Sequence, residues 1–346
     1  MKRRVLFLIT LFISMISITG KAQQVIDVHA HIIPQSYLDC LAKHDALLDE
    51  DFPIPHWDID EHLRFMDEAG IACSVLTLPA PQPYFFDEQS GRAERGDSEE
   101  SARLIRQVNE EMAAVKAEHK GRFLFCAALP LPDVDAAIHE AIYALDTLHA
   151  DGVKLASNSR GLYLGDPALD PLMEVLNERG TVIITHPHKP ATNNETLTSV
   201  VPLASYEYLA ETTRAILNMV GHNVMLRYPR LKVVVPHCGS FLPLAVPRMQ
   251  SLMPVMNGVG YLQGVDIKQN LQALYYDLAG AATPETIREM LTITSPSHLL
   301  YGTDYPYVKA PVLVKNLSVL KANLADILPE DVDNVLYQNA IQLFAK

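Results

Sequence analysis

Short apolar runs alternate with amphipathic stretches along most of the chain. The runs are rich in Val, Ile and Leu without regular polar alternation, which is typical of parallel strands buried on both faces. The stretches between them place apolar residues at helical spacing, as in Ile59, Leu63 and Met66 before the helix stop Gly70. The eight runs cover residues 25–31, 73–78, 123–129, 152–155, 181–186, 232–237, 274–278 and 299–304. This alternation predicts an α/β fold of the TIM type, a (β/α)8 barrel.

Four of the predicted strands end in residues that can bind a metal ion. The first ends in His29-Ala30-His31, the fifth in His186, the sixth in His237 and the eighth in Asp304. Side chains alternate between the faces of a strand, so His29 and His31 point the same way. The C-terminal ends of barrel strands meet at one mouth, where active sites lie. Buried polar groups there need each other or a metal as partners, so the pattern favours a metal site over structural histidines.

The first residues have the pattern of a secretory signal peptide. Basic residues 2–4 precede an apolar run over 5–18, and Gly20 and Ala22 suit the small positions of a cleavage site. An uncleaved membrane anchor is the alternative, but the run is short for a span of about 20 residues. We therefore expect residues 1–22 to be removed, no membrane span in the mature chain, and export to the periplasm or the medium.

Composition narrows the class of protein further. The formal net charge is −13, and removal of the basic N-terminus makes it more negative. Because affinity for nucleic acid depends on cations that neutralise phosphates, nucleic acid is excluded as a partner. No linker divides residues 23–346, which we expect to form a single barrel domain. Four cysteines without paired spacing are expected to be free thiols: Cys40, Cys73, Cys126 and Cys238.

Several motifs together resemble the amidohydrolase superfamily. They are His29-Ala30-His31, His186-Pro187, Pro236-His237-Cys238-Gly239 and Gly302-Thr303-Asp304-Tyr305-Pro306. Segments such as Met66-Asp67-Glu68-Ala69-Gly70-Ile71 and Gly152-Val153-Lys154-Leu155 are similar to the amidohydrolase-related branch. That branch contains aminocarboxymuconate-semialdehyde decarboxylase and related aromatic-acid decarboxylases. The likeness covers essentially the whole chain after the signal peptide.

The resemblance implies a mononuclear metal site, usually zinc. Its ligands would be His29, His31, His186 and Asp304. His237 would lie beside the metal-bound water or the substrate as an acid/base or polarising group. Imidazole and carboxylate ligands suit zinc and do not exclude manganese or iron.

Two further residues have two interpretations each. In binuclear members of the superfamily, a carbamylated lysine at the end of strand four bridges two metals, and Lys154 is the candidate here. The single-metal branch commonly has the same strand sequence without that role. Asp27 shares the side-chain parity of His29, so it either supports the metal ligands or caps a backbone group.

The chain departs from the decarboxylase relatives at two positions. Their upstream arginine, which holds a substrate carboxylate, has no match between Gln23 and His62. Where they have Trp after His-Pro, this chain has His188. Their second arginine is matched by Arg248, which in the relatives reaches the site of the neighbouring subunit. This match implies a homodimer in which Arg248 binds substrate, while an ordinary surface arginine is the alternative.

The residues and the resemblance together predict an exported metal-dependent enzyme. The expected reaction is non-oxidative decarboxylation of a small unsaturated or aromatic carboxylic acid, with His237 and Asp304 as catalytic residues. Hydrolysis of a carbonyl, lactone or C–C bond is the close alternative. A non-catalytic metal-dependent binding protein is the alternative from a different class.

Overall fold

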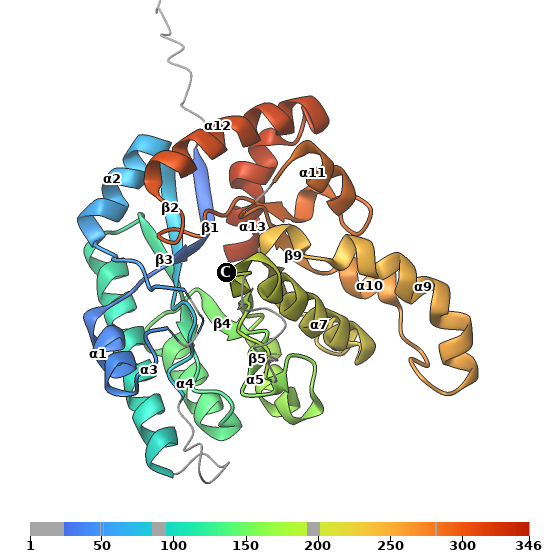
Figure 1. Cartoon of the computed structure of the whole chain (residues 1–346), viewed down its shortest axis with the longest axis horizontal. Helices are drawn as coiled ribbons and strands as arrows, with labels where there is room; N and C mark the ends of the chain where they lie inside the picture. The colour runs from blue at the N-terminus through green and yellow to red at the C-terminus, as the bar shows by residue number, and fades with distance from the viewer. Residues whose placement is uncertain are drawn as a thin grey trace, which may run out of the picture.

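The computed structural model describes residues 24–48, 50, 52–84, 95–191, 201–280 and 282–345. The predicted signal peptide, residues 1–22, lies outside them. Eight parallel strands form one sheet, surrounded by helices, and this confirms the predicted (β/α)8 barrel (Figure 1). In sheet order the strands are β1 Val25–His31, β2 Ile71–Thr77, β3 Phe123–Ala128, β4 Gly152–Ala156, β7 Val182–His186, β8 Lys232–Val235, β9 Tyr275–Asp277 and β10 Leu299–Leu300.

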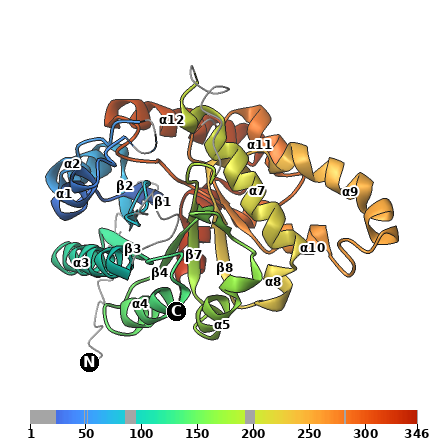
Figure 2. The same ribbon diagram turned by 60° about the horizontal axis from the view of Figure 1, so that its bottom comes forward.

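Helices connect consecutive strands and cover the outside of the sheet. Among the described residues they are α1 Gln35–Lys43, α2 Ile59–Ala69, α3 Arg95–Glu118, α4 Val134–Asp146, α5 Asp170–Glu178, α7 Glu207–Gly221, α8 Val224–Arg227, α9 Leu242–Gly258, α10 Ile267–Gln272, α11 Pro284–Met290, α12 Ala310–Ile327 and α13 Asn339–Phe344. A short hairpin, β5 Asn158–Ser159 and β6 Leu162–Tyr163, follows β4. Helix α9 extends away from the barrel, as Figures 1 and 2 show.

The bounds of α2 illustrate how local sequence sets an element. The side chain of Asp58 accepts a hydrogen bond from the Glu61 N–H and caps the first turn. Gly70 ends the helix in the left-handed region at φ 73°, where glycine has no Cβ penalty. The stop predicted at Gly70 is therefore confirmed.

The barrel closes between its first strand and the segment after its last. The Val28 N–H donates to the Tyr301 carbonyl at 2.9 Å, and the Asp304 N–H donates to the His29 carbonyl at 2.8 Å. The eighth strand is thus shorter than predicted, because β10 ends at Leu300 and the next residues pair with β1. This pairing brings Asp304 beside His29 and His31.

Two apolar layers stabilise the fold. The larger lies between the strands and the outer helices, and the smaller fills the barrel interior with residues such as Val28, Ile184 and Val234. Ala340 and Leu343 of α13 close the interior layer from the N-terminal end of the strands. The barrel is therefore a packed core, and its open mouth lies at the C-terminal ends of the strands.

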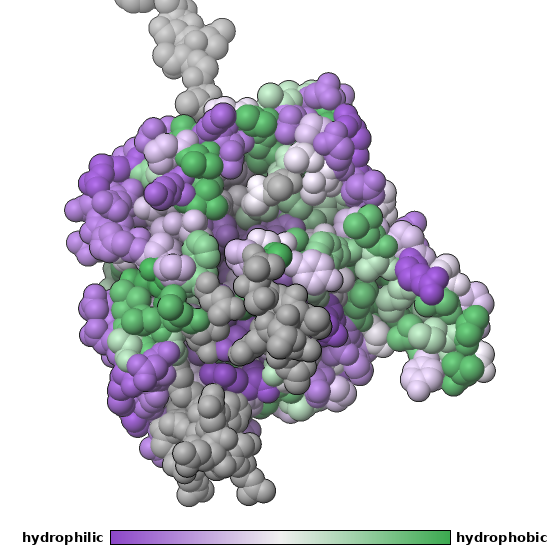
Figure 3. Space-filling model, viewed as in Figure 1, coloured by the Kyte–Doolittle hydropathy of each residue, from purple (hydrophilic) through white to green (hydrophobic). Residues whose placement is uncertain are grey.

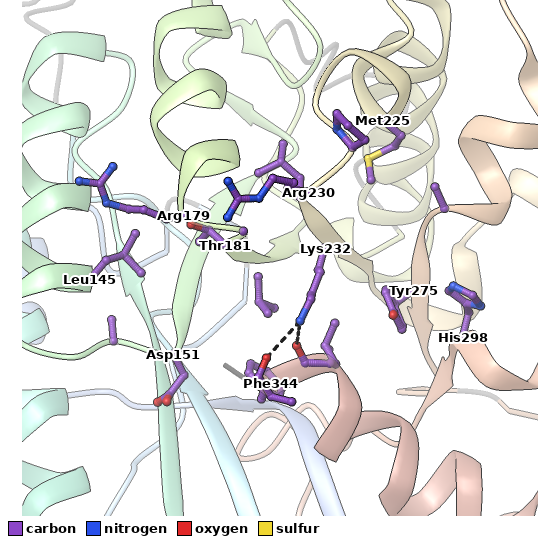
Figure 4. A pocket seen from close by; sticks show the side chains of 18 of the residues that line it. Leu145, Asp151, Arg179, Thr181, Met225, Arg230, Lys232, Tyr275, His298 and Phe344 are labelled. Carbon is purple, nitrogen blue, oxygen red and sulfur yellow. Dashed lines mark hydrogen bonds between the residues drawn. The ribbon is translucent and has the colours of Figure 1, made fainter.

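A cavity of about 1030 Å³ lies at the opposite, N-terminal end of the barrel (Figure 4). Strand beginnings line it, including Thr181, Lys232 and Tyr275, together with Phe344 from the end of α13. The Lys232 ammonium donates to the Leu343 carbonyl at 2.7 Å. None of the predicted site residues lines this cavity.

Two other expectations concern the described residues as a whole. All four cysteines are free, as predicted. No helix in the described ranges combines the length and apolar character needed to cross a membrane.

Candidate active site

Three histidines at strand ends, His29, His31 and His186, use Nδ1 for a contact within the protein and turn Nε2 toward the cluster. The Nδ1 of His29 lies 2.9 Å from Oδ2 of Asp277, and that of His186 lies 2.9 Å from the Pro187 carbonyl. The Nδ1 of His31 lies 2.9 Å from the Thr77 hydroxyl, which itself donates to the Ala30 carbonyl. Each Nδ1 therefore acts as the donor, and each Nε2 keeps its lone pair free for another partner.

Asp304 and His237 complete this cluster. Oδ1 of Asp304 lies 3.0 Å from Nε2 of His31 and 3.5 Å from Nε2 of His29. Nε2 of His237 lies 3.8 Å from Oδ2 of the same carboxylate. Ligand atoms of His29, His186, His237 and Asp304 all lie within 4.8 Å of one another. His237 therefore belongs to this group, whereas the predicted ligand His31 does not and approaches it only through Asp304 and the neighbouring rings.

Unusual backbone conformations aim the two residues that face the cavity. His237 has φ 56° and Asp304 has φ 63°, and Cys238, Gly239 and Ser240 continue in the left-handed region. For residues other than glycine such conformations cost about 1–3 kcal/mol each and persist where surrounding contacts enforce them. One such contact is the hydrogen bond of 3.0 Å from the His237 N–H to Asp277.

Gly302 allows the closing segment to approach the first strand. A Cβ at this position would lie 2.8 Å from the Cβ of His29 and 3.3 Å from that of Asp277. Any larger side chain would push apart the ligand His29 and the carboxylate that orients it. The glycine of the Gly-Thr-Asp motif is thus required by this close approach.

Burial and neighbouring charges set the protonation of the cluster. Burial lowers the pKa of His31 to about 4 and moves the pKa of His186 well below its usual value, so both rings are neutral at pH 7. Burial opposes the ionisation of Asp304, but the neighbouring rings of His237, His29 and His31 hold its pKa well below its usual value. Burial opposes the charged form of His29, but the carboxylates of Asp277 and Asp304 raise its pKa well above its usual value. The site therefore presents two neutral imidazoles and one protonated imidazole to an ionised carboxylate. A metal that binds Nε2 of His29 would displace that proton.

This donor set fits a divalent metal ion. Nε2 of His29 is buried without a hydrogen-bond partner. The lone pair of His31 Nε2 faces the Asp304 carboxylate at 3.0 Å, an arrangement that a cation between the two acceptors would stabilise. Neutral imidazoles held by a second partner at Nδ1, together with one carboxylate, are the ligands that zinc and related metals take in proteins.

A cavity of about 480 Å³ opens above the cluster at the C-terminal mouth of the barrel. Its floor includes His186, His237 and Asp304. Side chains of mostly apolar or aromatic character form the walls, among them Phe52, Pro81, Tyr208, Leu209, Tyr307 and Val308. A volume of this size lies in the range of small-molecule sites and accommodates one substituted aromatic ring.

The residues with two interpretations take definite places. Asp27 accepts hydrogen bonds from the backbone N–H groups of His29 and Thr303, both at 3.0 Å, as in the capping interpretation. Burial raises the pKa of Asp27 to about 7. Lys154 is buried on β4 and pairs in register with Ile184, two residues before His186 on β7. Among the described residues, no carboxylate lies within ion-pair distance of it. Its bridging role stays a prediction.

The structure keeps Arg248 away from the cavity of its own chain. Arg248 lies exposed on α9, and the residues that line the cavity do not include it. Arg248 therefore does not reach the cavity of its own chain, and its role in substrate binding across a subunit interface stays a prediction.

Sequence reasoning missed three residues of the site. Asp277 orients the ring of His29 and accepts a hydrogen bond from the His237 N–H. Its position near the end of the seventh predicted strand could have identified it as a site residue. Glu50 and Tyr208 line the cavity from segments that carry no strand pattern or motif. His188, noted only as a departure, is buried and pairs through Nδ1 with Oε1 of Glu50.

Comparisons with known proteins agree with this geometry. The family model described as Amidohydrolase matches residues 26–346. Decarboxylase yanB of Aspergillus niger is 31% identical over 93% of this chain and 87% of its own length. The 6-methylsalicylic acid decarboxylase of Penicillium expansum is 27% identical over 93% of this chain and 96% of its own length. A solved structure described as an amidohydrolase II superposes with a TM-score of 0.83 at 29% identity, covering 93% of this chain and all of its own.

Proposed function

The chain belongs to the amidohydrolase family and is a decarboxylase of that family, and from this premise we propose that it releases CO₂ non-oxidatively from a small hydroxylated aromatic acid. The observation that carries the proposal is the cluster of His29, His186, His237 and Asp304, of which the last three line a cavity of about 480 Å³. A relative with 27% identity is named for 6-methylsalicylic acid, a substrate with one carboxylate, one hydroxyl and one ring.

The site residues divide into binding and proton-transfer roles. His29, His31, His186 and Asp304 would hold the metal, which would supply a Lewis acid for substrate oxygens. His29, His186 and Asp304 belong to the 4.8 Å cluster, and Nε2 of His31 lies 3.0 Å from Asp304. His237 carries a proton on Nε2 and delivers it to the ring carbon that bears the carboxylate. The C–C bond electrons then remain with the ring as CO₂ leaves. Oδ2 of Asp304 lies 3.8 Å from Nε2 of His237 and so faces the atom from which the proton would leave.

A panel of acids, lactones and amides tests the reaction. Metal-loaded protein should release CO₂ from hydroxybenzoates and should form the corresponding phenols in equal amount. Hydrolysis of lactones or amides without CO₂ release would instead support the hydrolase alternative. Purified protein that contains no metal and converts no compound of the panel would favour the binding-protein alternative.

Zinc is the proposed metal. Three imidazoles and one carboxylate form a nitrogen-rich set that suits zinc better than the oxygen-rich sets typical of magnesium or calcium. Solved structures of related fold include decarboxylases with bound manganese, so manganese is the competing metal. Elemental analysis of protein purified without added metal, followed by reconstitution of the apoprotein with each ion, distinguishes the two.

A homodimer built through α9 is the proposed assembly. This helix projects from the barrel, and apolar residues gather on it and on the segment after it (Figure 3). Leu244 is 73% exposed, Val259 is 64% exposed and Tyr261 is 66% exposed, which is costly for a surface that stays in water. A second copy that covers this face would bring Arg248 to the neighbouring mouth, where its guanidinium can hold a carboxylate.

Mixing two inactive variants tests the shared site. Arg248→Ala and His237→Ala proteins should each lose turnover, and hybrid dimers should regain part of it, because one site then receives both intact residues. Hybrids that form without regaining activity, or a monomer at assay concentration, would refute the shared site.

Export of the mature chain is proposed from the N-terminal pattern alone. The basic start, apolar run and small residues up to Ala22 support cleavage after residue 22. N-terminal sequencing of protein recovered from a bacterial periplasmic extract should begin at Gln23. Full-length chain retained inside the cell or in the membrane fraction would contradict it.

A further inference from the structure

Glu50 is a buried carboxylate on the wall of the active-site cavity that the proposed chemistry does not use. It is 4% exposed and lines the same cavity as His237 and Asp304. Carboxylates are rarely buried unless they are paired. A fixed negative charge beside a site for an acidic substrate therefore restricts which acids fit.

Two segments fix the position of this carboxylate. The Tyr208 hydroxyl of α7 donates to Oε2 at 2.8 Å, and the Lys189 N–H donates to Oε2 at 2.9 Å. The ring of His188 pairs with Oε1. Oε1 accepts no regular hydrogen bond from the described residues, so one of the acceptor positions of this carboxylate stays unsatisfied.

Apart from the proposed metal, the described lining of the cavity offers no cation to a second substrate carboxylate, and Lys154, which interacts electrostatically with Glu50, does not line it. No lysine or arginine is among the described residues that line it, and its walls near Glu50 include Phe52 and Tyr307. Two carboxylates that face each other in such surroundings repel, and an unpaired buried charge is strongly disfavoured. A neutral hydroxyl at the same place would donate to Glu50 and satisfy both groups.

We propose that Glu50 is a specificity-determining residue: it accepts a hydrogen bond from a neutral donor group on the substrate ring and excludes acids that carry a second carboxylate there. This inference rests on the proposed function and narrows it to monocarboxylic acids. The carboxylate that is lost would face His237 and Asp304, and the donor group would face the wall formed by Glu50 and Tyr208.

Ligands that differ only in charge test the proposal on the unaltered protein. A suitable series is 2-hydroxybenzoate with a hydroxyl, a carboxamide or a second carboxylate at ring position 3, 4 or 5. A carboxamide has the shape of a carboxylate but is neutral and donates hydrogen bonds. At the position that faces Glu50, calorimetric dissociation constants should be about 100-fold weaker for the carboxylate than for the carboxamide. Equal affinity at all three positions would overturn the proposal.

The variant Glu50→Gln keeps the shape of the side chain and removes its charge. In this variant the ratio of the dissociation constants of the carboxylate and carboxamide ligands should fall by about tenfold or more. Tyr208→Phe is the matched control, because it removes one contact to Glu50 and leaves the charge, so the difference should persist. A Glu50→Gln protein that discriminates as strongly as the unaltered protein would refute the role.

Binding and turnover separate this proposal from the proposed function. If the unaltered protein binds the ligands with the expected preference but releases no CO₂ from any of them, the decarboxylase assignment fails and the role of Glu50 stands. If it releases CO₂ from acids with and without a second carboxylate at equal kcat/KM, the role of Glu50 fails and the assignment stands. Should Glu50→Gln not fold, the ligand series alone decides.

Discussion

Both ends of the barrel carry a cavity, and the larger one is at the end without the predicted site residues. At the N-terminal end, a cavity of about 1030 Å³ is bordered by Lys232, whose ammonium donates to the Leu343 carbonyl, and by Thr181, whose Oγ1 is a single buried atom without a partner. At the C-terminal mouth, about 480 Å³ lies above polar atoms that lack partners, such as Nε2 of His29 and Nδ1 of His237. Volume therefore does not identify the active site. Convergent unsatisfied groups do, because burying them is costly unless a ligand arrives.

The largest effect is expected from removing a ligand at the C-terminal mouth. His29→Ala should lose both the metal and all measurable turnover, because His29 lies at the centre of the cluster and offers an orphaned Nε2. Elemental analysis of the purified variant provides the measurement, with circular dichroism to verify the fold. Retention of one equivalent of metal would show that His29 is not a ligand.

A smaller effect is expected from the residue beside the ligands. His237→Ala should keep the metal while kcat falls by about 10²–10⁴-fold, the usual contribution of a positioned acid or base. Because His237 lies in the same 4.8 Å cluster as His29, His186 and Asp304, this variant distinguishes an acid/base role from a role as a metal ligand. Loss of metal equal to that in His29→Ala would place His237 among the ligands.

The contrast between the two ends also explains what the sequence could predict. Strand ends are readable because apolar runs stop abruptly at His29, His186 and His237, and barrel topology brings such ends together. Asp277 was overlooked because its strand is short and partly aromatic, so its polar end stood out less.

Residues outside the strands were beyond the reach of pattern reasoning. Glu50 reaches the cavity through contacts with Lys189 and Tyr208, which are more than a hundred residues away in sequence. No periodicity encodes such long-range contacts. The left-handed backbone of His237 and Asp304 likewise depends on tertiary contacts, since any residue with a Cβ pays a steric cost in that region.

A buried histidine near the barrel mouth predicts a stability effect that depends on pH. Burial lowers the pKa of His62 to about 3, and the Trp57 N–H donates to its Nδ1 at 3.2 Å. Because the folded-state pKa lies below that of the unfolded chain, the stabilisation is complete above about pH 6.5. It is lost as the pH falls toward 3, by about 1.4 kcal/mol per pH unit.

Replacement of His62 tests this dependence. In His62→Phe the free energy of unfolding, measured by urea titration, should fall less steeply between pH 6.5 and 4 than in the unaltered protein. The exposed His139 of α4 provides the control, since His139→Gln should leave the slope unchanged. Identical slopes for His62→Phe and the unaltered protein would show that His62 does not contribute.

The smallest effect is expected at the N-terminal cavity. Lys232 donates to the carbonyls of Leu343 at 2.7 Å and Ala345 at 3.4 Å, and so holds the end of α13 against the barrel (Figure 4). Lys232→Met keeps the length of the side chain and removes these bonds. The free energy of unfolding should fall by about 1–2 kcal/mol, the value of hydrogen bonds to a partly exposed charged group. Because this contact lies at the opposite end from the histidine cluster, kcat and metal content should stay unchanged. A tenfold loss of kcat with metal retained would mean that α13 and the mouth are coupled, and the separation of a stabilising end from a catalytic end would then be wrong.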